Sequence, residues 1–148
     1  MGEKTSEMTR ENFLGAWELV SYEFRESGGK VIKHEAQALL IYDKSGYVSV
    51  QLMRPGRLTF KSGDPYRATA EEMKSAFEGF VSYYGTYEID NEQGTVTHHI
   101  KASLFPNLVG THQARSFSFS GNQITLSTTP TIEKGIELVK VMVWQRIT

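Results

Sequence analysis

Turn residues interrupt this chain at short intervals, and strand-forming stretches lie between them. Gly121 and Asn122 separate two such stretches by only two residues, a spacing typical of a tight β-hairpin. The loops 43–46 and 91–94 both end in glycine, which adopts the positive φ that short turns often require. This pattern predicts an all-β meander in which consecutive strands pair as antiparallel hairpins.

Eight strands are expected, and they lie at 16–25, 37–42, 47–53, 84–90, 95–104, 111–120, 123–129 and 138–147. Eight strands are enough to close a barrel around one small ligand, and closure removes the two exposed edges of an open sheet. We therefore predict an eight-stranded antiparallel up-and-down barrel. A sandwich is the alternative, but its Greek-key connections are hard to build from loops this short.

One segment departs from the strand pattern. Thr69 and Glu72 have the spacing of a capping box, in which each side chain satisfies a backbone amide at a helix start. Apolar residues at 73, 76, 77, 80 and 81 then form one helical stripe. We predict a helix over about 69–82, between the third and fourth strands. The stripe either covers apolar barrel surface or acts as a lid over the barrel mouth.

The whole chain, 1–148, is expected to form one domain, with residues 1–10 flexible. Its net charge of −1 argues against nucleic-acid binding, which depends on clustered cations. There is no cysteine for a disulfide or a thiolate metal site. No apolar run is long enough for membrane insertion, and no secretory signal is visible, so we expect a cytoplasmic protein.

Both ends of the predicted barrel carry a recognisable motif. Gly15-Ala16-Trp17 opens the first strand, and Arg146 lies in the last. Longer matching stretches are 14–21, 46–55, 84–87, 95–99 and 106–115. Together they resemble the lipocalin-like domain family of bacteria and fungi, although Ala16 stands where members typically have threonine. The resemblance implies a lipocalin-type barrel in which Arg146 packs over the Trp17 ring, and it implies no general reaction.

Alternation along the strands predicts which side chains face the barrel interior. His98 faces inward and His99 outward, because Val96 and Ile100 share the His98 face. The strand 47–53 is ambiguous, and we place its amphipathic face inward because its polar groups would find partners in a ligand site. The predicted ligand-binding set is Tyr47, Ser49, Gln51, Tyr87, His98, Gln113, Arg115 and Phe117.

Arg115 is the most informative member of this set. It shares a face with Phe117 and Phe119, and a guanidinium buried there needs a partner. The partner is an internal carboxylate such as Glu23, ordered water, or the acidic group of a ligand. An internal network of Arg115, Glu23, Tyr87 and His98 that only stabilises the barrel is the alternative to ligand anchoring.

His98 has two possible roles. It is a candidate hydrogen-bond donor or general acid/base, or it is an interior histidine satisfied by a neighbouring tyrosine. No metal site is expected, because His98 and His99 point to opposite faces and His112 faces outward. No cofactor is expected either. The loop 54–67 has a local charge of +3, which either attracts anions to the mouth or is simply solvated.

Three functional hypotheses follow from these residues. The first is a carrier or sensor that binds a small hydrophobic or weakly acidic molecule in the barrel. The second is a cofactor-free isomerase, cyclase or hydratase acting on a polyketide-like or terpenoid-like substrate, with His98 as catalytic residue; no catalytic motif compels it. The third is an interaction module with a filled core that forms a homodimer.

Overall fold

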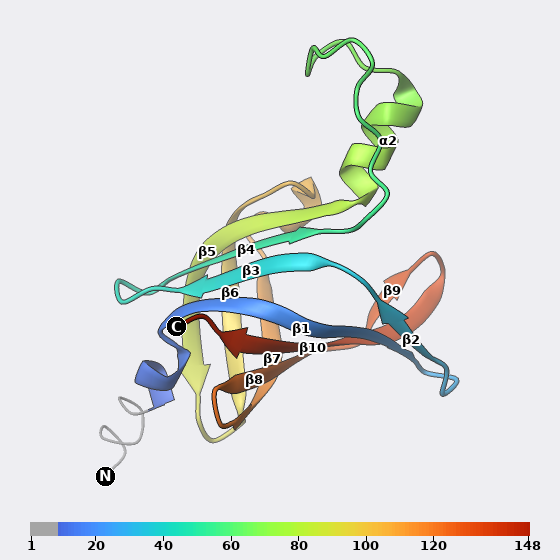
Figure 1. Cartoon of the computed structure of the whole chain (residues 1–148). Helices are drawn as coiled ribbons and strands as arrows, with labels where there is room; N and C mark the ends of the chain where they lie inside the picture. The colour runs from blue at the N-terminus through green and yellow to red at the C-terminus, as the bar shows by residue number, and fades with distance from the viewer. Residues whose placement is uncertain (1–8) are drawn as a thin grey trace.

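One antiparallel sheet closes on itself in this chain (Figure 1). The structure is a computed structural model that describes residues 9–148. In order around the ring, the eight barrel strands are β1 (Gly15–Glu26), β3 (Gln37–Tyr42), β4 (Tyr47–Met53), β5 (Phe80–Asp90), β6 (Thr95–Ser103), β7 (His112–Ser120), β8 (Gln123–Thr128) and β10 (Ile136–Arg146). Strand β10 pairs with β1, which closes the ring and confirms the predicted eight-stranded barrel. The expected flexibility of residues 1–10 concerns mainly 1–8, which lie outside the described residues.

Two short strands extend the ring beyond the eight that the sequence predicted. Strand β2 (Val31–His34) pairs with β1, and β9 (Thr131–Glu133) pairs with β10. Both lie at the end of the barrel where β1 and β10 continue past their other neighbours. They are only four and three residues long, too short to give a clear alternation in the sequence.

The predicted capping box is present at the start of helix α2 (Ala70–Glu78). The Thr69 hydroxyl accepts a hydrogen bond from the Glu72 amide at 3.1 Å, and the Glu72 carboxylate accepts one from the Thr69 amide at 2.9 Å. The predicted helix end at residue 82 is wrong. Phe80 and Val81 instead begin β5 and pair with β4, because a ladder with a long neighbouring strand outweighs one more helical turn.

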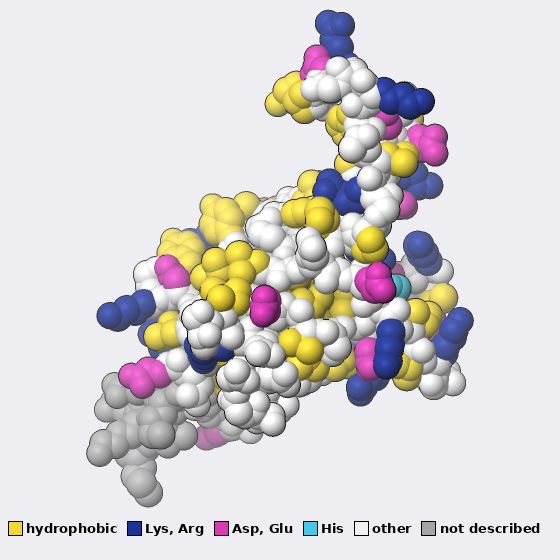
Figure 2. All heavy atoms as spheres, viewed as in Figure 1, with side chains coloured by type: hydrophobic (Ala, Val, Ile, Leu, Met, Phe, Trp, Pro, Cys, Tyr) yellow, Lys and Arg dark blue, Asp and Glu magenta, His cyan; other side chains and the backbone are white. Residues whose placement is uncertain are grey.

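Helix α2 and the preceding segment 54–69 form an arm that projects from the barrel (Figure 1). Met73 and Phe77 are 52% and 45% exposed. The apolar stripe therefore does not cover the barrel wall, which was the first of its two predicted roles. It lines an open groove of about 590 Å³ together with residues of the arm and of β5. Figure 2 shows hydrophobic, acidic and basic side chains interspersed on this arm. A short 3-10 helix, η1 (Pro106–Leu108), lies between β6 and β7.

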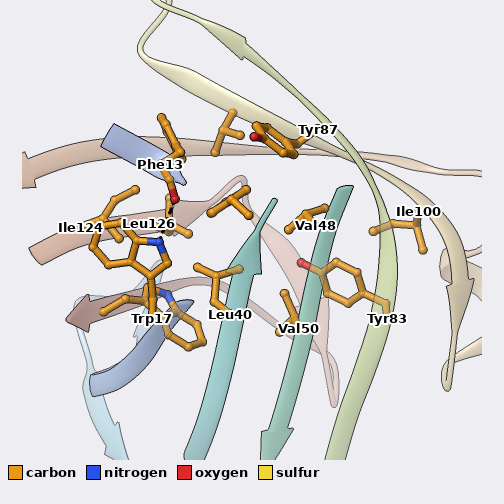
Figure 3. Close-up of a cluster of buried hydrophobic side chains, with 13 residues drawn as sticks. Phe13, Trp17, Leu40, Val48, Val50, Tyr83, Tyr87, Ile100, Ile124 and Leu126 are labelled. Carbon is orange, nitrogen blue, oxygen red and sulfur yellow. Dashed lines mark hydrogen bonds between the residues drawn. The ribbon is translucent and has the colours of Figure 1, made fainter. Parts of the chain in front are cut away.

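Aromatic side chains fill one end of the barrel. Residues 9–13 are helical and bring Phe13 over this end, where its ring makes edge contacts at 5.0–5.1 Å with Tyr42, Phe117 and Phe119. The Trp17 indole donates a hydrogen bond to the Phe13 carbonyl at 2.9 Å, as Figure 3 shows. Phe13 and Trp17 are almost completely buried, so this end of the barrel is closed.

Arg146, on the last strand, contacts the start of the first strand. Its guanidinium lies 4.2 Å from the centre of the Trp17 ring and donates hydrogen bonds to the carbonyls of Asn12 and Leu14. Gly15 has a φ of +120°, and a Cβ at this position would lie 3.1 Å from an Arg146 nitrogen. Only glycine therefore allows the chain to enter the barrel so close to the guanidinium.

We expect Arg146→Ala to lower the free energy of unfolding by about 3 kcal/mol, because the variant loses a cation–π contact and leaves two carbonyls without their charged donor. Urea denaturation measures this change. The matched control is Arg25→Ala, which removes an exposed cation that pairs with Glu23 on the barrel exterior. The control is expected to cost less than about 0.5 kcal/mol. Equal effects of the two substitutions would contradict the role of Arg146.

Candidate functional site

The inner face of β4 is aliphatic. Val48, Val50 and Leu52 are buried, whereas Tyr47 is 42% exposed. The expectation that Tyr47, Ser49 and Gln51 face the interior is therefore wrong. Burying three aliphatic side chains stabilises the barrel more than burying their polar neighbours would. The Gln51 amide oxygen instead accepts a hydrogen bond from the Ser82 hydroxyl on the outer face.

A buried histidine joins two tyrosines across the barrel interior. His98, on β6, is 1% exposed, and its Nε2 lies 2.7 Å from the hydroxyl of Tyr42 on β3. Its Nδ1 lies 2.7 Å from the hydroxyl of Tyr83 on β5. Figure 3 shows Tyr83 pointing inward from its strand beside Val50. Both ring nitrogens are thus occupied, and we call these three residues the Tyr–His–Tyr group.

The protonation states of this group follow from its burial. Burial lowers the pKa of His98 to about 3, and the positive charge of Arg115 and then His99 contribute further. Burial also raises the pKa of both Tyr42 and Tyr83. At neutral pH the imidazole is therefore neutral and both phenols are protonated. A neutral imidazole donates one hydrogen bond and accepts one, so the tyrosine that accepts keeps its own proton free to donate.

Arg115 lies on the inner face of β7 and has no acidic partner among residues 9–148. It stands opposite Val96 on β6 and Thr128 on β8 in the strand register. It donates a hydrogen bond to the Ala114 carbonyl at 3.3 Å, and it lies close enough to the Tyr83 hydroxyl to oppose the rise in the pKa of that phenol. No carboxylate in residues 9–148 forms an ion pair with it. Glu23, one of the three partners considered for Arg115, pairs instead with Arg25 on the outer face.

The remaining predicted residues are divided between the two halves of the interior. Tyr87 is buried, but its hydroxyl donates to the Asp43 carbonyl at 3.0 Å, towards the closed end. Phe117 packs against Phe13 in the same end. Gln113 lies opposite His98 in the register, and its amide donates to the Thr111 hydroxyl at 2.9 Å.

Sequence reasoning missed Tyr42 and Tyr83 as members of the site. The predicted strand began at Tyr84, one residue after Tyr83, although alternation from Tyr87 through Gly85 reaches Tyr83. Gly85 is needed here because a Cβ would lie 1.8 Å from the His99 carbonyl oxygen, where β5 and β6 shift register. The same alternation along β3 places Tyr42 on the inner face with Leu40.

Two cations, Arg54 and Lys140, lie at the end of the barrel opposite the aromatic rings around Phe13, which we call the aromatic core. Arg54, from the base of the arm, lies 6.0 Å from the Tyr22 ring and 5.5 Å from the Phe24 ring. Lys140 lies 5.1 Å from the Phe24 ring and forms an ion pair with Glu133 at 2.5 Å. Burial raises the pKa of Tyr22, although the nearby Arg54 opposes this shift. This end, which we call the cationic mouth, therefore carries more positive than negative charge.

The inward side chains between the two ends are only partly buried. A second hydrophobic cluster lies at the cationic mouth and consists of Tyr22, Phe24, Leu52 and Leu138. Four side chains pack against both this cluster and the aromatic core: Leu19, Ala38, Val81 and Met142. All four keep intermediate solvent exposure, as does Arg115. These side chains are therefore less completely buried than Phe13, Trp17 and Leu40 at the closed end.

Metal ligands do not cluster in this interior. Within residues 9–148, no group of three or more histidine, cysteine, aspartate or glutamate side chains is placed to hold a metal ion. Over the same residues, no helix is both long and apolar enough to cross a membrane.

A closed eight-stranded meander, sealed at one end by tryptophan and arginine and lined by apolar side chains with a few polar groups, defines a barrel of the lipocalin type. The family model described as "lipocalin-like domain" matches residues 14–147, so the chain belongs to the lipocalin-like domain family.

Comparisons with individual proteins add one named relative. The chain is 29% identical over 107 residues to the 4'-hydroxy-3'-methoxypropiophenone carrier protein ppsC of Aspergillus oryzae. This match covers 68% of this chain and 96% of that protein. A lipocalin-like protein from Bacteroides uniformis matches with a TM-score of 0.48 and 12% identity, over 92% of this chain and 99% of its own. A redesigned β-barrel matches with a TM-score of 0.44 and 13% identity, over 94% and 95%.

The low pKa of His98 predicts a pH dependence of stability. The unfolded histidine titrates near 6.5 and the folded one near 3, so between these values the unfolded chain binds the extra proton. Stability from this residue is therefore complete above pH 6.5 and falls by up to about 1.4 kcal/mol per unit as pH decreases towards 3. Urea denaturation at pH 7.5, 5.5 and 4.5 measures the slope.

The His98→Gln variant is expected to lose this component of the slope. Tyr83→Phe removes one partner but retains the imidazole, and it is the matched control that keeps the slope. Parallel pH profiles for the wild type and His98→Gln would contradict a buried neutral histidine.

Proposed function

We propose that this chain binds and carries one small hydrophobic molecule that has an acidic or phenolic oxygen. The ligand lies in the barrel between the Tyr–His–Tyr group and the cationic mouth. The observation that carries this proposal is Arg115, an inward guanidinium without an ion-pair partner in residues 9–148. A guanidinium at such a position is costly unless an anion or a strong acceptor meets it, and a ligand oxygen supplies that partner.

The surrounding side chains suit the rest of such a molecule. Leu19, Val81 and Met142 provide apolar, partly buried surface between the two ends of the barrel. The Tyr–His–Tyr group supplies one hydroxyl proton beyond its internal hydrogen bonds, and this proton fits a carbonyl or ether oxygen. A mostly apolar wall with a few placed polar groups is the usual composition of a small-molecule site.

Two further observations support an oxygen-bearing ligand. Arg54 and Lys140 place positive charge at the mouth, which favours the approach of an anionic or polarised molecule. The Aspergillus oryzae relative is named as the carrier of a hydroxylated aromatic ketone, a small molecule of this general chemistry. The cytoplasmic location and the homodimer remain predictions from the sequence.

The enzymatic alternative has no support from the geometry of His98. A general acid or base must reach the substrate with a nitrogen that can exchange a proton. Both nitrogens of His98 are held by tyrosine hydroxyls, and burial lowers its pKa to about 3, which removes it from acid/base work at neutral pH. We therefore propose binding without turnover.

Substitution of Arg115 tests the proposal. The probe is 4'-hydroxy-3'-methoxypropiophenone together with a panel of aromatic carboxylic acids, and binding is followed by calorimetry. We expect Arg115→Met to weaken the tightest-binding probe by about 10- to 100-fold, the loss of one charge-assisted hydrogen bond. Arg25→Met removes a cation from the outer face and is the matched control, with unchanged affinity.

Two results would count against the proposal. One is that no member of the panel binds the wild type. The other is that Arg115→Met and Arg25→Met bind the same probe equally well, which would place the ligand away from the interior guanidinium.

A further inference from the structure

Two histidines meet on the outer face of the barrel, apart from the interior site. His99 on β6 and His112 on β7 stand directly opposite one another in the strand register. Their Nδ1 atoms are 2.6 Å apart, and their ring centres are 4.7 Å apart. His98 and His99 point to opposite faces, as predicted, but the outward His112 lies beside His99, a pairing that depends on the register of β6 and β7.

The two Nδ1 atoms converge on one point in a geometry close to that of a metal site. Two imidazole nitrogens bound to one tetrahedral zinc ion, each about 2.0–2.1 Å from the metal, lie about 3.3 Å apart. The observed 2.6 Å separation requires the rings to open by less than about 1 Å. The terminal torsion of histidine is soft enough for such a rotation, and the strand ladder holds both Cα atoms in place.

Glu88 on β5 lies where its charge favours the tautomer of His99 that a metal requires. Its carboxylate lies 3.5 Å from Nε2 of His99, which is not the nitrogen that faces His112 and which forms no hydrogen bond with the described residues. A carboxylate at this position favours a proton on Nε2, which leaves the Nδ1 lone pair directed towards His112. The same arrangement of carboxylate, histidine and metal is the usual second-shell arrangement of metal-bound histidines.

The histidine pair is accessible to solvent, and charged side chains lie near it. His112 is exposed, and the side chain of His99 is 28% exposed. Lys101, two residues along β6, carries its ammonium 5.1 Å from the Tyr47 ring. Glu88 is 80% exposed and adds negative charge beside the pair.

We propose that His99 and His112 together bind one divalent transition-metal ion of the zinc or copper class on the outer face of β6 and β7. Imidazole nitrogen suits these ions, whereas magnesium and calcium prefer oxygen ligands. No third histidine, cysteine, aspartate or glutamate in the described part of the chain joins the pair, so water completes the coordination. The site is independent of the ligand in the barrel interior.

Metal titration of the full chain tests this site. Zn²⁺ binding is measured by calorimetry in a buffer that does not chelate metals, and Cu²⁺ coordination is measured by electron paramagnetic resonance. We expect one ion per chain and a copper spectrum with two equivalent nitrogen ligands. His99→Gln and His112→Gln are each expected to weaken Zn²⁺ binding at least tenfold, and Glu88→Gln by severalfold.

The matched control is His34→Gln, since His34 lies beside the Phe24 ring at the cationic mouth, away from the pair. It is expected to bind Zn²⁺ as the wild type does. Circular dichroism verifies that each variant is folded; the two histidine variants report on the same site, so one folded variant suffices. Unchanged Zn²⁺ affinity in a folded His99→Gln or His112→Gln variant, or no binding by the wild type, would overturn the proposal.

Discussion

The pairing of β1 with β10 is the constraint on which the rest of this structure depends. Nine residue pairs connect the first and last strands, and Arg146 adds its contacts to Trp17 and to the backbone before β1. Without this closure the sheet would have two open edges, and its concave face would be accessible to bulk water. A guanidinium and an imidazole on that face would then be ordinary solvated side chains. Closure therefore creates the interior in which Arg115 and His98 acquire chemical significance.

The interior changes in character along the barrel axis. The end beneath Phe13 is filled with aromatic rings, and it stabilises the fold. The middle contains the Tyr–His–Tyr group, whose hydrogen bonds offset the cost of burying three polar side chains. The cationic mouth lies at the other end, where Arg54 and Lys140 stack on aromatic rings. Within the described part of the chain, Arg115 lacks the internal ion pair that would balance its charge, and this imbalance is the physical basis of the proposed ligand site.

The fold was predictable because its determinants are local. Turn residues such as Gly121 and Asn122 define the hairpins, and alternation correctly placed His98 and Arg115 inside. Alternation alone does not say which face of a strand is buried when both faces are plausible, and the interior orientation of Tyr47, Ser49 and Gln51 was wrong for that reason. The partners of His98 come from strands far apart in the sequence, so their identity depends on register. The approach of Arg54 to the mouth depends on how the arm packs, which no local pattern encodes.

The central claim is that the space beside Arg115 holds a ligand. A crystal structure of the protein purified from its own host cells tests this claim most directly. The account predicts ordered density for one small molecule between Arg115 and the Tyr–His–Tyr group, with an oxygen atom within hydrogen-bond distance of the guanidinium. An interior packed solid with side chains, or an Arg115 side chain paired with a carboxylate of the chain itself, would contradict it.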